Sequence, residues 1–326
     1  MNFKYSVIIP HYNIPNLLKR AINSIPTRND VEIIVVDDGS ETHNLESVRE
    51  ICKNKANVIE LDKNKGGGKA RNIGIDAARG EFVIFLDADD FFNYCINDIL
   101  NDYADTKQDV IFFKGNCIYS DTYMNGNRFD YLNRIIDIWF TNPTQGEYLL
   151  RYHFGVPVCK IIRKNVITDN NIKFDEVPIH DDVTFSYTLG YKAKTITADH
   201  RCLYCATIRD GSVNKQQSAA LTLLTICILG RAVLFFRSIG KDDAGYETSL
   251  SHNLYILLRR KDYQSFNKGF EHLQELGLDR REMERLFAKR MAETALSSCV
   301  WCILYAPNAN IRKWSLIYFP KSFVKV

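Results

Sequence analysis

The sequence lacks a strong excess of charge of either sign, since 42 Lys and Arg stand against 39 Asp and Glu for a formal net charge of +3. It also lacks a long run of Lys and Arg, so nothing in the charge pattern favours a nucleic-acid-binding protein. Internal repeats and low-complexity segments are absent as well. A hydrophobic content of 46% with 25% charged residues is typical of a soluble globular protein, and 326 residues allow one large or two ordinary domains.

Long apolar runs are missing too. The longest, residues 221–236, is interrupted by Arg231 and is shorter than the roughly 20 residues that a membrane-spanning helix needs. At the N-terminus, Met1–Lys4 leads directly into the strand-like Tyr5–Pro10, without the apolar core or cleavage site of a secretory signal. We therefore expect a cytoplasmic protein in which the nine cysteines stay reduced.

Two Cys-x-x-Cys pairs, Cys202/Cys205 and Cys299/Cys302, superficially resemble a four-thiolate zinc site. The first pair lies in a strand-like run, where residues three apart point to opposite faces. The second lies far along the chain in an apolar helical segment. We predict buried structural thiols here in preference to zinc.

Strand and helix signals alternate in the N-terminal part of the chain. Apolar runs predict strands over residues 6–10, 32–37, 57–61, 81–86 and 110–113. Apolar residues at three- and four-residue spacing predict helices over residues 15–24, 45–54, 69–78 and 96–106. This order is typical of an α/β fold with a mostly parallel sheet flanked by helices.

The sequence pattern changes after about residue 120. Residues 120–150 are richer in Asn, Thr, Asp and Gly, which indicates an excursion or a lid. Strand character returns over 156–162 and 195–207, with a helical pattern over 182–189 between them. The helical spacing then continues over 221–237, 246–260, 263–276 and 280–303. We expect an α/β domain over 1–214 and a helical C-terminal domain over 215–326.

Three carboxylates, Asp87, Asp89 and Asp90, follow directly after the predicted strand 81–86. Side chains two apart on an extended strand share a face, so Asp87 and Asp89 point together at the carboxyl end of the sheet, where α/β proteins bind ligands. A divalent metal that carries a diphosphate would neutralise them. The alternative is that the triplet ends a strand and caps the next helix, which is all that we expect of Asp90.

Other polar residues are expected at the same edge. Asp37 and Asp38 leave the second strand, where carboxylates suit a nucleotide base or ribose, although Asp-Gly-Ser also forms ordinary turns. Tyr12 follows the first strand and either stacks on a base or packs inside. Gly66–Gly68 allow close approach of a phosphate, but the spacing of a P-loop is absent. Lys69 and Arg71 beside them fit solvated charges at a helix start equally well.

Four motifs in order carry a resemblance to family 2 glycosyltransferases over roughly residues 4–214. They are Ser6-Val7-Ile8-Ile9-Pro10-x-Tyr12-Asn13, Val36-Asp37-Asp38-Gly39-Ser40, Gly68-Lys69-Ala70-Arg71-Asn72-Ile73-Gly74 and Gly80-Glu81-Phe82-x-x-Phe85-Leu86-Asp87-Ala88-Asp89-Asp90. The resemblance implies a GT-A-type fold, a nucleotide-diphospho-sugar donor and inversion at the anomeric carbon.

The resemblance also implies a role for each matching residue. The nucleotide site would consist of Pro10, Tyr12, Asp37, Asp38, Arg71 and Asp87. The base, commonly uracil, would contact Pro10, Tyr12 and Asp38, with Asp37 in support. Arg71 would approach the nucleotide and Asp87 the ribose or sugar. Mn²⁺ or Mg²⁺ would bridge the diphosphate at Asp89, next to Asp87.

Two later segments match the family as well. Residues 178–187 match its Glu-Asp segment, with Asp181 where Glu is usual and Asp182 where the family has its catalytic base. The alternative for this pair is helix capping. Residues 203–212 resemble the flexible Arg-x-Gly-Ser segment, in which Arg209 would clamp the departing phosphates; the alternative is a surface-loop charge.

The expected activity is that of an inverting hexosyl- or N-acetylhexosaminyl-transferase. It would move a sugar from a UDP-linked donor to a hydroxyl of a glycan or lipid-linked acceptor in surface polysaccharide synthesis. Two other classes stay open: a non-catalytic nucleotide-sugar or carbohydrate-binding module, and a sugar nucleotidyltransferase. The latter normally has a basic glycine-rich loop directly after the first strand, where this chain has Pro10–Asn13.

The C-terminal residues 311–326 combine Lys and Arg with aromatic residues and contain no acidic residue. Such a segment either anchors an enzyme peripherally at the anionic inner face of a membrane or packs on the helical domain. The donor sugar, the acceptor and the oligomeric state have no readable signature, although a helical face that forms a homo-oligomer is one arrangement.

Overall fold

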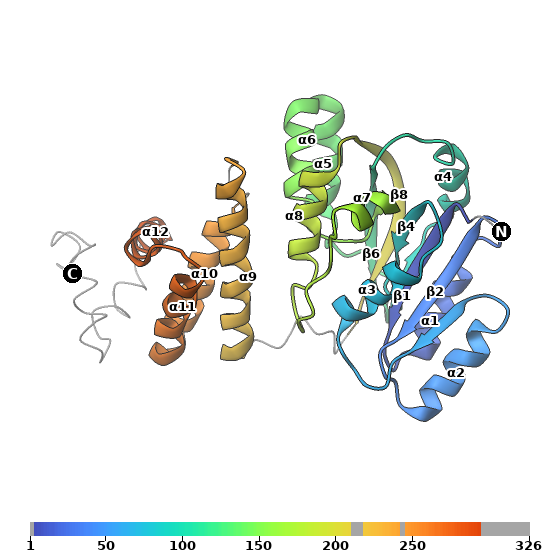
Figure 1. The fold of residues 1–326 in the computed structure, drawn as a ribbon, viewed down its shortest axis with the longest axis horizontal. Helices are drawn as coiled ribbons and strands as arrows, with labels where there is room; N and C mark the ends of the chain where they lie inside the picture. The colour runs from blue at the N-terminus through green and yellow to red at the C-terminus, as the bar shows by residue number, and fades with distance from the viewer. Residues whose placement is uncertain (1–2, 210–217, 242–244, 295–326) are drawn as a thin grey trace. The chain divides into compact units, whose positions relative to one another are not determined.

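The computed structural model describes residues 3–209, 218–241 and 245–294 (Figure 1). The chain divides into two compact units, Met1–Ser212 and Val213–Val326. The first contains all the strands of the described residues and the second contains only helices.

The first unit contains an eight-stranded mixed sheet in the order β3-β2-β1-β4-β7-β6-β8-β5. The strands are β1 Tyr5–His11, β2 Val31–Asp37, β3 Asn57–Glu60, β4 Phe82–Phe85, β5 Phe91–Phe92, β6 Val110–Tyr119, β7 Lys160–Arg163 and β8 Ile196–Ile208. The pairs β1–β2, β1–β4, β2–β3 and β6–β8 are parallel, whereas β7 runs antiparallel between β4 and β6, and β5 runs antiparallel to β8. The predicted α/β fold class is confirmed.

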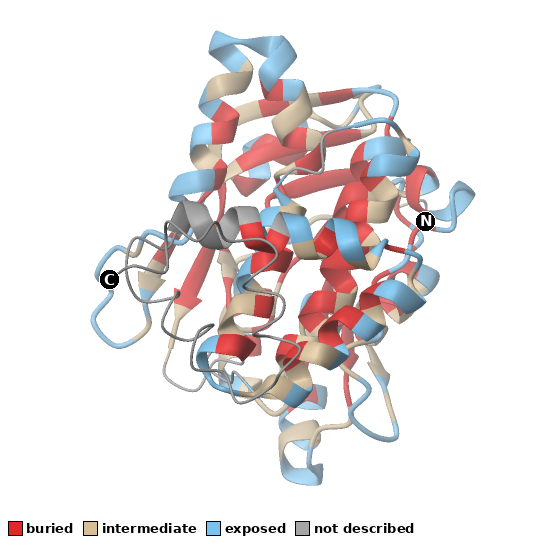
Figure 2. Cartoon of the chain, turned by 90° about the vertical axis from the view of Figure 1, so that its left-hand side faces the viewer, coloured by how far each residue is buried: buried red, intermediate tan, exposed pale blue. Residues whose placement is uncertain are grey.

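Helices flank this sheet, and many residues of the strands and of the helices are buried (Figure 2). Apolar residues form the core between them. The helices are α1 Pro15–Asn23, α2 Thr42–Cys52, α3 Gly67–Ala77, α4 Ile96–Asp102, α5 Asp130–Thr141, α6 Pro143–Tyr152, α7 Lys164–Asp169 and α8 Val183–Lys192. The central strand β4 is buried along its whole length, as its uninterrupted apolar sequence predicts.

The structure adds detail to two expectations for the middle of the chain. The excursion over 120–150 contains two helices, because α5 buries Leu132, Ile135 and Ile136 at helical spacing despite its polar neighbours. The strand predicted over 156–162 begins only at Lys160. The residues before it form a loop whose carbonyls bond to side chains instead of a neighbouring strand.

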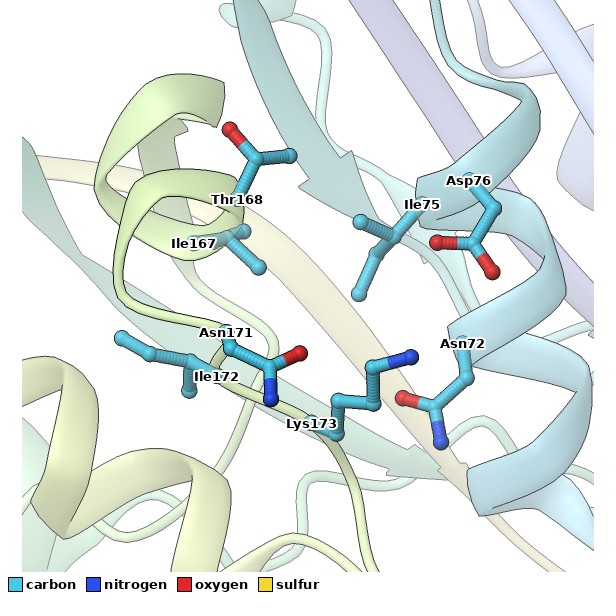
Figure 3. Close-up of a pocket in the computed structure, with 8 residues that line it drawn as sticks. All are labelled: Asn72, Ile75, Asp76, Ile167, Thr168, Asn171, Ile172 and Lys173. Atoms are coloured by element: carbon cyan, nitrogen blue, oxygen red, sulfur yellow. The ribbon is translucent and has the colours of Figure 1, made fainter.

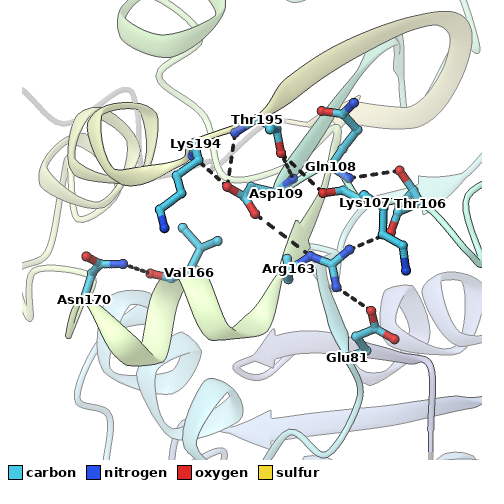
Figure 4. A network of polar contacts seen from close by, with 10 residues as sticks. All are labelled: Glu81, Thr106, Lys107, Gln108, Asp109, Arg163, Val166, Asn170, Lys194 and Thr195. Carbon is cyan, nitrogen blue, oxygen red and sulfur yellow. Dashed lines mark hydrogen bonds and ion pairs between the residues drawn. The ribbon is translucent and has the colours of Figure 1, made fainter.

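A polar network ties the sheet together near the start of β6 (Figure 4). Arg163 of β7 forms an ion pair with Glu81 and donates a hydrogen bond to the carbonyl oxygen of Thr106 at 2.6 Å. Asp109 accepts hydrogen bonds from the backbone N–H groups of Lys194 at 2.6 Å and Thr195 at 3.2 Å. The network therefore fixes the entry into β8 against β6 and β7.

The second unit consists of α9 Ala219–Ser238, α10 Tyr246–Arg259, α11 Tyr263–Glu275 and α12 Arg280–Thr294. They share a core to which Ile226, Leu254, Phe270 and Phe287 belong. The expectation for the apolar stretch over 221–236 needs correction, because α9 is long and apolar enough to cross a membrane by length and composition. Half of its apolar window is buried, and the core helix of a soluble protein meets the same criterion.

Lys160 is buried in this fold, and its Nζ donates hydrogen bonds to the carbonyl oxygens of Phe154 at 2.9 Å and Val156 at 2.5 Å. Burial lowers the pKa of Lys160 to about 7, against a partial opposing effect of the negative charge of Asp182. The folded protein therefore loses this proton near pH 7, while the unfolded chain keeps it until about pH 10.5.

Because the unfolded state binds more protons in this window, Lys160 makes the free energy of unfolding rise with pH above 7. We expect Lys160→Met to lack this contribution, so that urea unfolding shows a smaller rise than in the wild type between about pH 7 and about pH 10. Lys53→Met, a change at an exposed lysine, is the control and should keep the wild-type slope. Equal slopes for Lys160→Met and the wild type would contradict a buried, neutralised lysine.

Candidate active site

The carboxyl ends of β1, β2 and β4 lie side by side in the sheet. His11 of β1 is in register with Asp37 of β2, and Ile8 of β1 with Phe85 of β4. The residues that follow these strands therefore meet at one edge, where α/β sheets bind ligands. The structure brings together there the predicted site residues Pro10, Tyr12, Asp37, Asp38, Asp87 and Asp89.

Two of the three acidic residues after β4 are each paired with an arginine. Asp87 Oδ1 accepts a hydrogen bond from Arg71 Nη2 at 2.7 Å, and Asp89 Oδ2 accepts one from Arg209 Nε at 3.1 Å. The side chains of Asp87 and Asp89 keep 32% and 26% of their surface exposed, so both carboxylates still face solvent. Two partly exposed acids, each with a cationic partner, form a site that an anion with its own counter-ion can enter.

Arg71 of α3 links this edge to a segment far along the chain. Its Nη1 donates to Asp181 Oδ2 at 2.6 Å, and its guanidinium lies over the ring of Phe174 at 5.4 Å from the centroid. Burial opposes the charge, but the carboxylates of Asp87 and Asp181 outweigh it and raise the pKa of Arg71. Among the described residues, the buried Nε has no hydrogen-bond partner. Arg71 therefore holds Asp87 and Asp181 at one site.

The glycine loop before α3 allows this approach. A Cβ atom on Gly68 would lie 2.1 Å from the carbonyl oxygen of Asp175 and 3.1 Å from Cβ of Asp181. A side chain at this position would therefore push the segment that contains Asp181 away from α3. The loop brings two chain segments together here, and this close packing accounts for at least one of its three glycines.

Asp182 directly precedes α8, at its N-cap position, but its side chain makes no capping hydrogen bond. The capping alternative is therefore wrong for this residue. Burial, followed by the negative charge of Asp181, raises the pKa of Asp182 to about 6. A carboxylate with this pKa is ionised at neutral pH and accepts a proton more readily than an exposed aspartate.

The two carboxylates after β2 bind groups of the protein itself. Asp37 is buried and accepts hydrogen bonds from Ser40, while its Oδ2 lies 2.7 Å from Nδ1 of His11. Burial opposes its charge, yet the hydrogen bonds from His11 and Ser40 lower the pKa of Asp37. Asp38 accepts from the backbone N–H groups of Lys65 at 2.7 Å and Gly66 at 2.8 Å. These contacts fix the strand ends and the glycine loop, while Tyr12 keeps 45% of its surface exposed.

A buried cluster beneath Asp89 was not predicted from the sequence. Arg20 of α1 and the hydroxyl of Thr207 both donate to the backbone carbonyl of Asp89, the latter at 2.5 Å. Asp90 accepts from the hydroxyl of Tyr204 at 2.5 Å and from the backbone N–H of Thr207 at 2.7 Å. Asp90 therefore ties β8 to the acidic segment. It does not cap the next helix, as was expected of it, because the N-cap residue of α4 is Cys95. No local signal marks Arg20, because its partners lie far along the chain.

The acidic side chains fit a hard divalent metal such as Mg²⁺ or Mn²⁺. Carboxylate oxygens suit these ions, and Mg²⁺ is usually held by one or two carboxylates together with substrate phosphates. Within residues 3–209, 218–241 and 245–294, no three His, Cys, Asp or Glu side chains converge on a metal position by themselves. A metal at Asp89 would therefore need oxygens from a bound ligand.

Three sequence expectations fall elsewhere. Cys202 and Cys205 lie in β8 as free thiols. Outside the described residues lie Cys299 and Cys302, the segment after Arg209 with Gly211 and Ser212, and the tail over 311–326.

A cavity of about 160 Å³ lies between α3 and the end of α7 (Figure 3). It is lined by Asn72, Asp76, Thr168 and Lys173 among others, and it includes none of the predicted site residues.

Comparison with known proteins places these features in a family. Residues 6–170 match the model of glycosyl transferase family 2, half of the chain. The chain is 31% identical over 224 residues to the poly(ribitol-phosphate) beta-N-acetylglucosaminyltransferase TarS of Staphylococcus aureus, a match that covers 64% of this chain and 36% of that protein. The chain thus spans little more than a third of that relative. A second relative, the putative glycosyltransferase EpsH of Bacillus subtilis, is 28% identical over 84% of this chain and 82% of its own length.

A solved structure agrees with these relatives. The crystal structure of S. aureus TarS 1–349 in complex with UDP-GlcNAc superposes with a TM-score of 0.57 at 25% identity, over 96% of this chain and 84% of that one. The α/β architecture and the matched motifs lead to the same assignment. The chain belongs to glycosyl transferase family 2.

Proposed function

We propose that this enzyme transfers a hexosyl or N-acetylhexosaminyl group from a UDP-linked donor, with inversion, to a hydroxyl of a glycan or lipid-linked acceptor in surface polysaccharide synthesis. The observation that carries the proposal is the continuous line of contacts from Asp181 through Arg71 to Asp87, with Asp182 at one end and the Asp89–Arg209 pair at the other. The similarity to TarS, whose structure holds UDP-GlcNAc, supports a UDP-linked donor.

The nucleotide would lie against the ends of β1 and β2. The exposed ring of Tyr12 is available for stacking on the base, beside Pro10. Asp38 already accepts two backbone hydrogen bonds, so its contact with a base would use the remaining lone pairs of its oxygens. Asp37 would act in support, through His11 and Ser40.

The diphosphate would lie near Asp87 and Asp89. These two residues would hold Mn²⁺ or Mg²⁺, which would stabilise the negative charge that grows on the departing UDP. Arg209 Nε now bonds to Asp89, and the guanidinium would turn its Nη groups toward the phosphates. Arg71 would keep Asp87 in place and approach the nucleotide from the other side.

Asp182 would act as the general base. The acceptor hydroxyl attacks the anomeric carbon, the bond to UDP breaks, and the hydroxyl proton goes to Asp182. The raised pKa of this carboxyl, about 6, suits the task at neutral pH. Asp181 would be a positioning residue, because it contacts Arg71 and raises the pKa of its neighbour.

The charge of Asp181 should be visible in the pH dependence of the reaction. We expect kcat/KM to fall as the pH drops through about 6, where Asp182 becomes protonated. Asp181→Asn removes a negative charge that raises the pKa of Asp182. The acidic limb, which is the fall of kcat/KM on the low-pH side of the profile, should therefore move to lower pH. Asp76→Asn, the same change at an exposed residue of α3, is the control and should leave the limb in place. A limb that stays unchanged in Asp181→Asn, or moves to higher pH, would exclude this coupling.

A panel of UDP- and GDP-sugars, incubated with the full chain and Mn²⁺, tests the proposed function. We expect slow release of free sugar and UDP from at least one UDP-linked donor, with water in place of the acceptor. A non-catalytic binding module would bind UDP without releasing sugar from any donor, and a nucleotidyltransferase would instead release a sugar phosphate when given pyrophosphate. Either result would replace the proposal by that alternative.

The site of action is proposed on the same basis. Polysaccharide synthesis from cytoplasmic sugar nucleotides would place the enzyme in the cytoplasm, peripherally on the inner face of the membrane where a lipid-linked acceptor is available. A homo-oligomer is compatible with this proposal.

A further inference from the structure

We propose that the loop His153–Val156 forms the acceptor side of the site beside Asp182, and that Gly155 sets how large a hydroxyl-bearing acceptor can enter. This inference rests on the proposed function, since it assumes that Asp182 receives the proton of the acceptor. It adds a part of the site that the family motifs do not include.

A hydrogen bond joins the loop to the face of α8 that lies nearest Asp182. Ser186 donates from its side-chain hydroxyl to the carbonyl oxygen of Gly155 at 2.8 Å, and from its backbone N–H to the carbonyl oxygen of Asp182 at 2.9 Å. Residues four apart in a helix lie on one face, one turn from each other. Ser186 therefore lies about one helical turn, roughly 6 Å along the helix axis, beyond Asp182, and its hydroxyl holds Gly155 there.

Lys160 holds the loop from inside. Its buried Nζ donates hydrogen bonds to the carbonyl oxygens of Phe154 and Val156, on either side of the carbonyl that Ser186 binds. Three consecutive carbonyls are thus fixed, which leaves this tripeptide little freedom to shift. The loop and Asp182 are also close enough for the charge of Asp182 to act on Lys160.

The space in front of Gly155 is open. A Cβ atom built on Gly155 would meet no other atom within 4 Å, whereas one on Gly68 or Gly190 would collide with backbone. The backbone of Gly155 does not adopt a positive φ angle, so nothing in the fold requires glycine here. A fixed loop with free space beside a carboxylate is a suitable place for the incoming hydroxyl and the group that carries it.

A polar pair lies at the first residue of this loop. The hydroxyl of Tyr131 lies 3.1 Å from Nδ1 of His153, the first residue of the loop, and Tyr131 keeps 50% of its surface exposed. A phenol and an imidazole together can donate and accept hydrogen bonds. This chemistry fits a polyhydroxylated acceptor, a sugar or a polyol, better than an apolar one.

Gly155→Leu tests the inference in the full chain. The assay contains Mn²⁺ and the UDP-sugar that the donor panel identifies. Methanol, glycerol and methyl β-D-glucoside serve as acceptor probes, and the measured quantity is the ratio of glycoside formed to free sugar released. In each case the bond from the anomeric carbon to UDP breaks, the bond to the alcohol or water oxygen forms, and the proton goes to Asp182. Gly155→Ala gives the intermediate size, and Asn165→Leu adds the same side chain at an exposed position of α7.

We expect Gly155→Leu to lower the ratio for glycerol and methyl glucoside by about tenfold or more, and for methanol by less, because added methylenes discriminate most against large groups. Hydrolysis should stay within about twofold of the wild type, since water needs little space. Asn165→Leu should change neither quantity. Unchanged ratios in Gly155→Leu, or a wild type that hydrolyses the donor but captures none of the alcohols, would overturn this inference alone. A wild type that releases no UDP from any donor would overturn the proposed function with it.

Discussion

Asp182→Asn is expected to bind the donor like the wild type and to lose about 10²–10⁴-fold in the rate of transfer. The reason is that the amide keeps the size of the carboxylate but cannot take a proton from the attacking hydroxyl. The side chain forms no capping hydrogen bond at the start of α8, so its replacement removes no such bond from the helix. Two measurements separate the effects: calorimetry with UDP and Mn²⁺ for binding, and release of UDP under saturating donor for turnover.

Unfolding experiments supply the control for this variant. The folded protein raises the pKa of Asp182 to about 6, so between about pH 4 and pH 6 the native state binds more protons than the unfolded chain. This residue therefore makes the free energy of unfolding fall as the pH rises through that window. In Asp182→Asn this contribution to the pH dependence of the free energy of unfolding is absent. The variant should be at least as stable as the wild type at pH 7. Normal turnover in a folded Asp182→Asn protein would exclude the residue as the base.

Asp89→Ala should lose the dependence of UDP binding on the metal, because it removes the carboxylate proposed to hold Mn²⁺ beside the diphosphate. In the wild type we expect Mn²⁺ to tighten UDP binding, and in Asp89→Ala we expect equal affinity with and without the ion. The variant also frees Arg209 from its 3.1 Å hydrogen bond, so metal-independent binding of UDP should not weaken. Turnover should fall to the background, since the departing phosphate would lack its counter-ion.

The matched control for this change is Asp76→Ala, which removes an exposed carboxylate from α3. It should keep both the metal dependence and the turnover of the wild type. If Asp89→Ala still shows tighter UDP binding with Mn²⁺, the ion is held elsewhere and the proposed arrangement of the diphosphate is wrong.

The sequence was a sufficient guide where the signal is local. The run from Phe82 to Phe85 predicts a buried strand, and a strand there places the carboxylates after it at the carboxyl edge of the sheet. Parallel pairing then brings the ends of β1 and β2 beside them, so the position of Tyr12 and Asp38 follows from topology. The family resemblance added Asp182, which no local pattern distinguishes from a helix cap.

Other features depend on contacts between distant parts of the chain. The helices α5 and α6 were not predicted, because polar residues between their buried apolar residues obscure the helical spacing. The hydrogen bonds from Arg20 and Thr207 to the carbonyl of Asp89 join residues that only the folded sheet brings together. The ion pairs of Arg71 with Asp87 and Asp181 also join distant parts of the chain. The sequence around Arg71 was equally consistent with a solvent-exposed charge at the start of a helix.

A crystal structure of the full chain with UDP and Mn²⁺ tests the central claim most directly. We predict Mn²⁺ coordinated by the carboxylate of Asp89 and by both phosphates of UDP, with the base near Tyr12 and with the carboxylate of Asp182 facing the open side of the diphosphate. A nucleotide bound away from the ends of β1 and β4, or a metal that does not touch Asp89, would contradict the account.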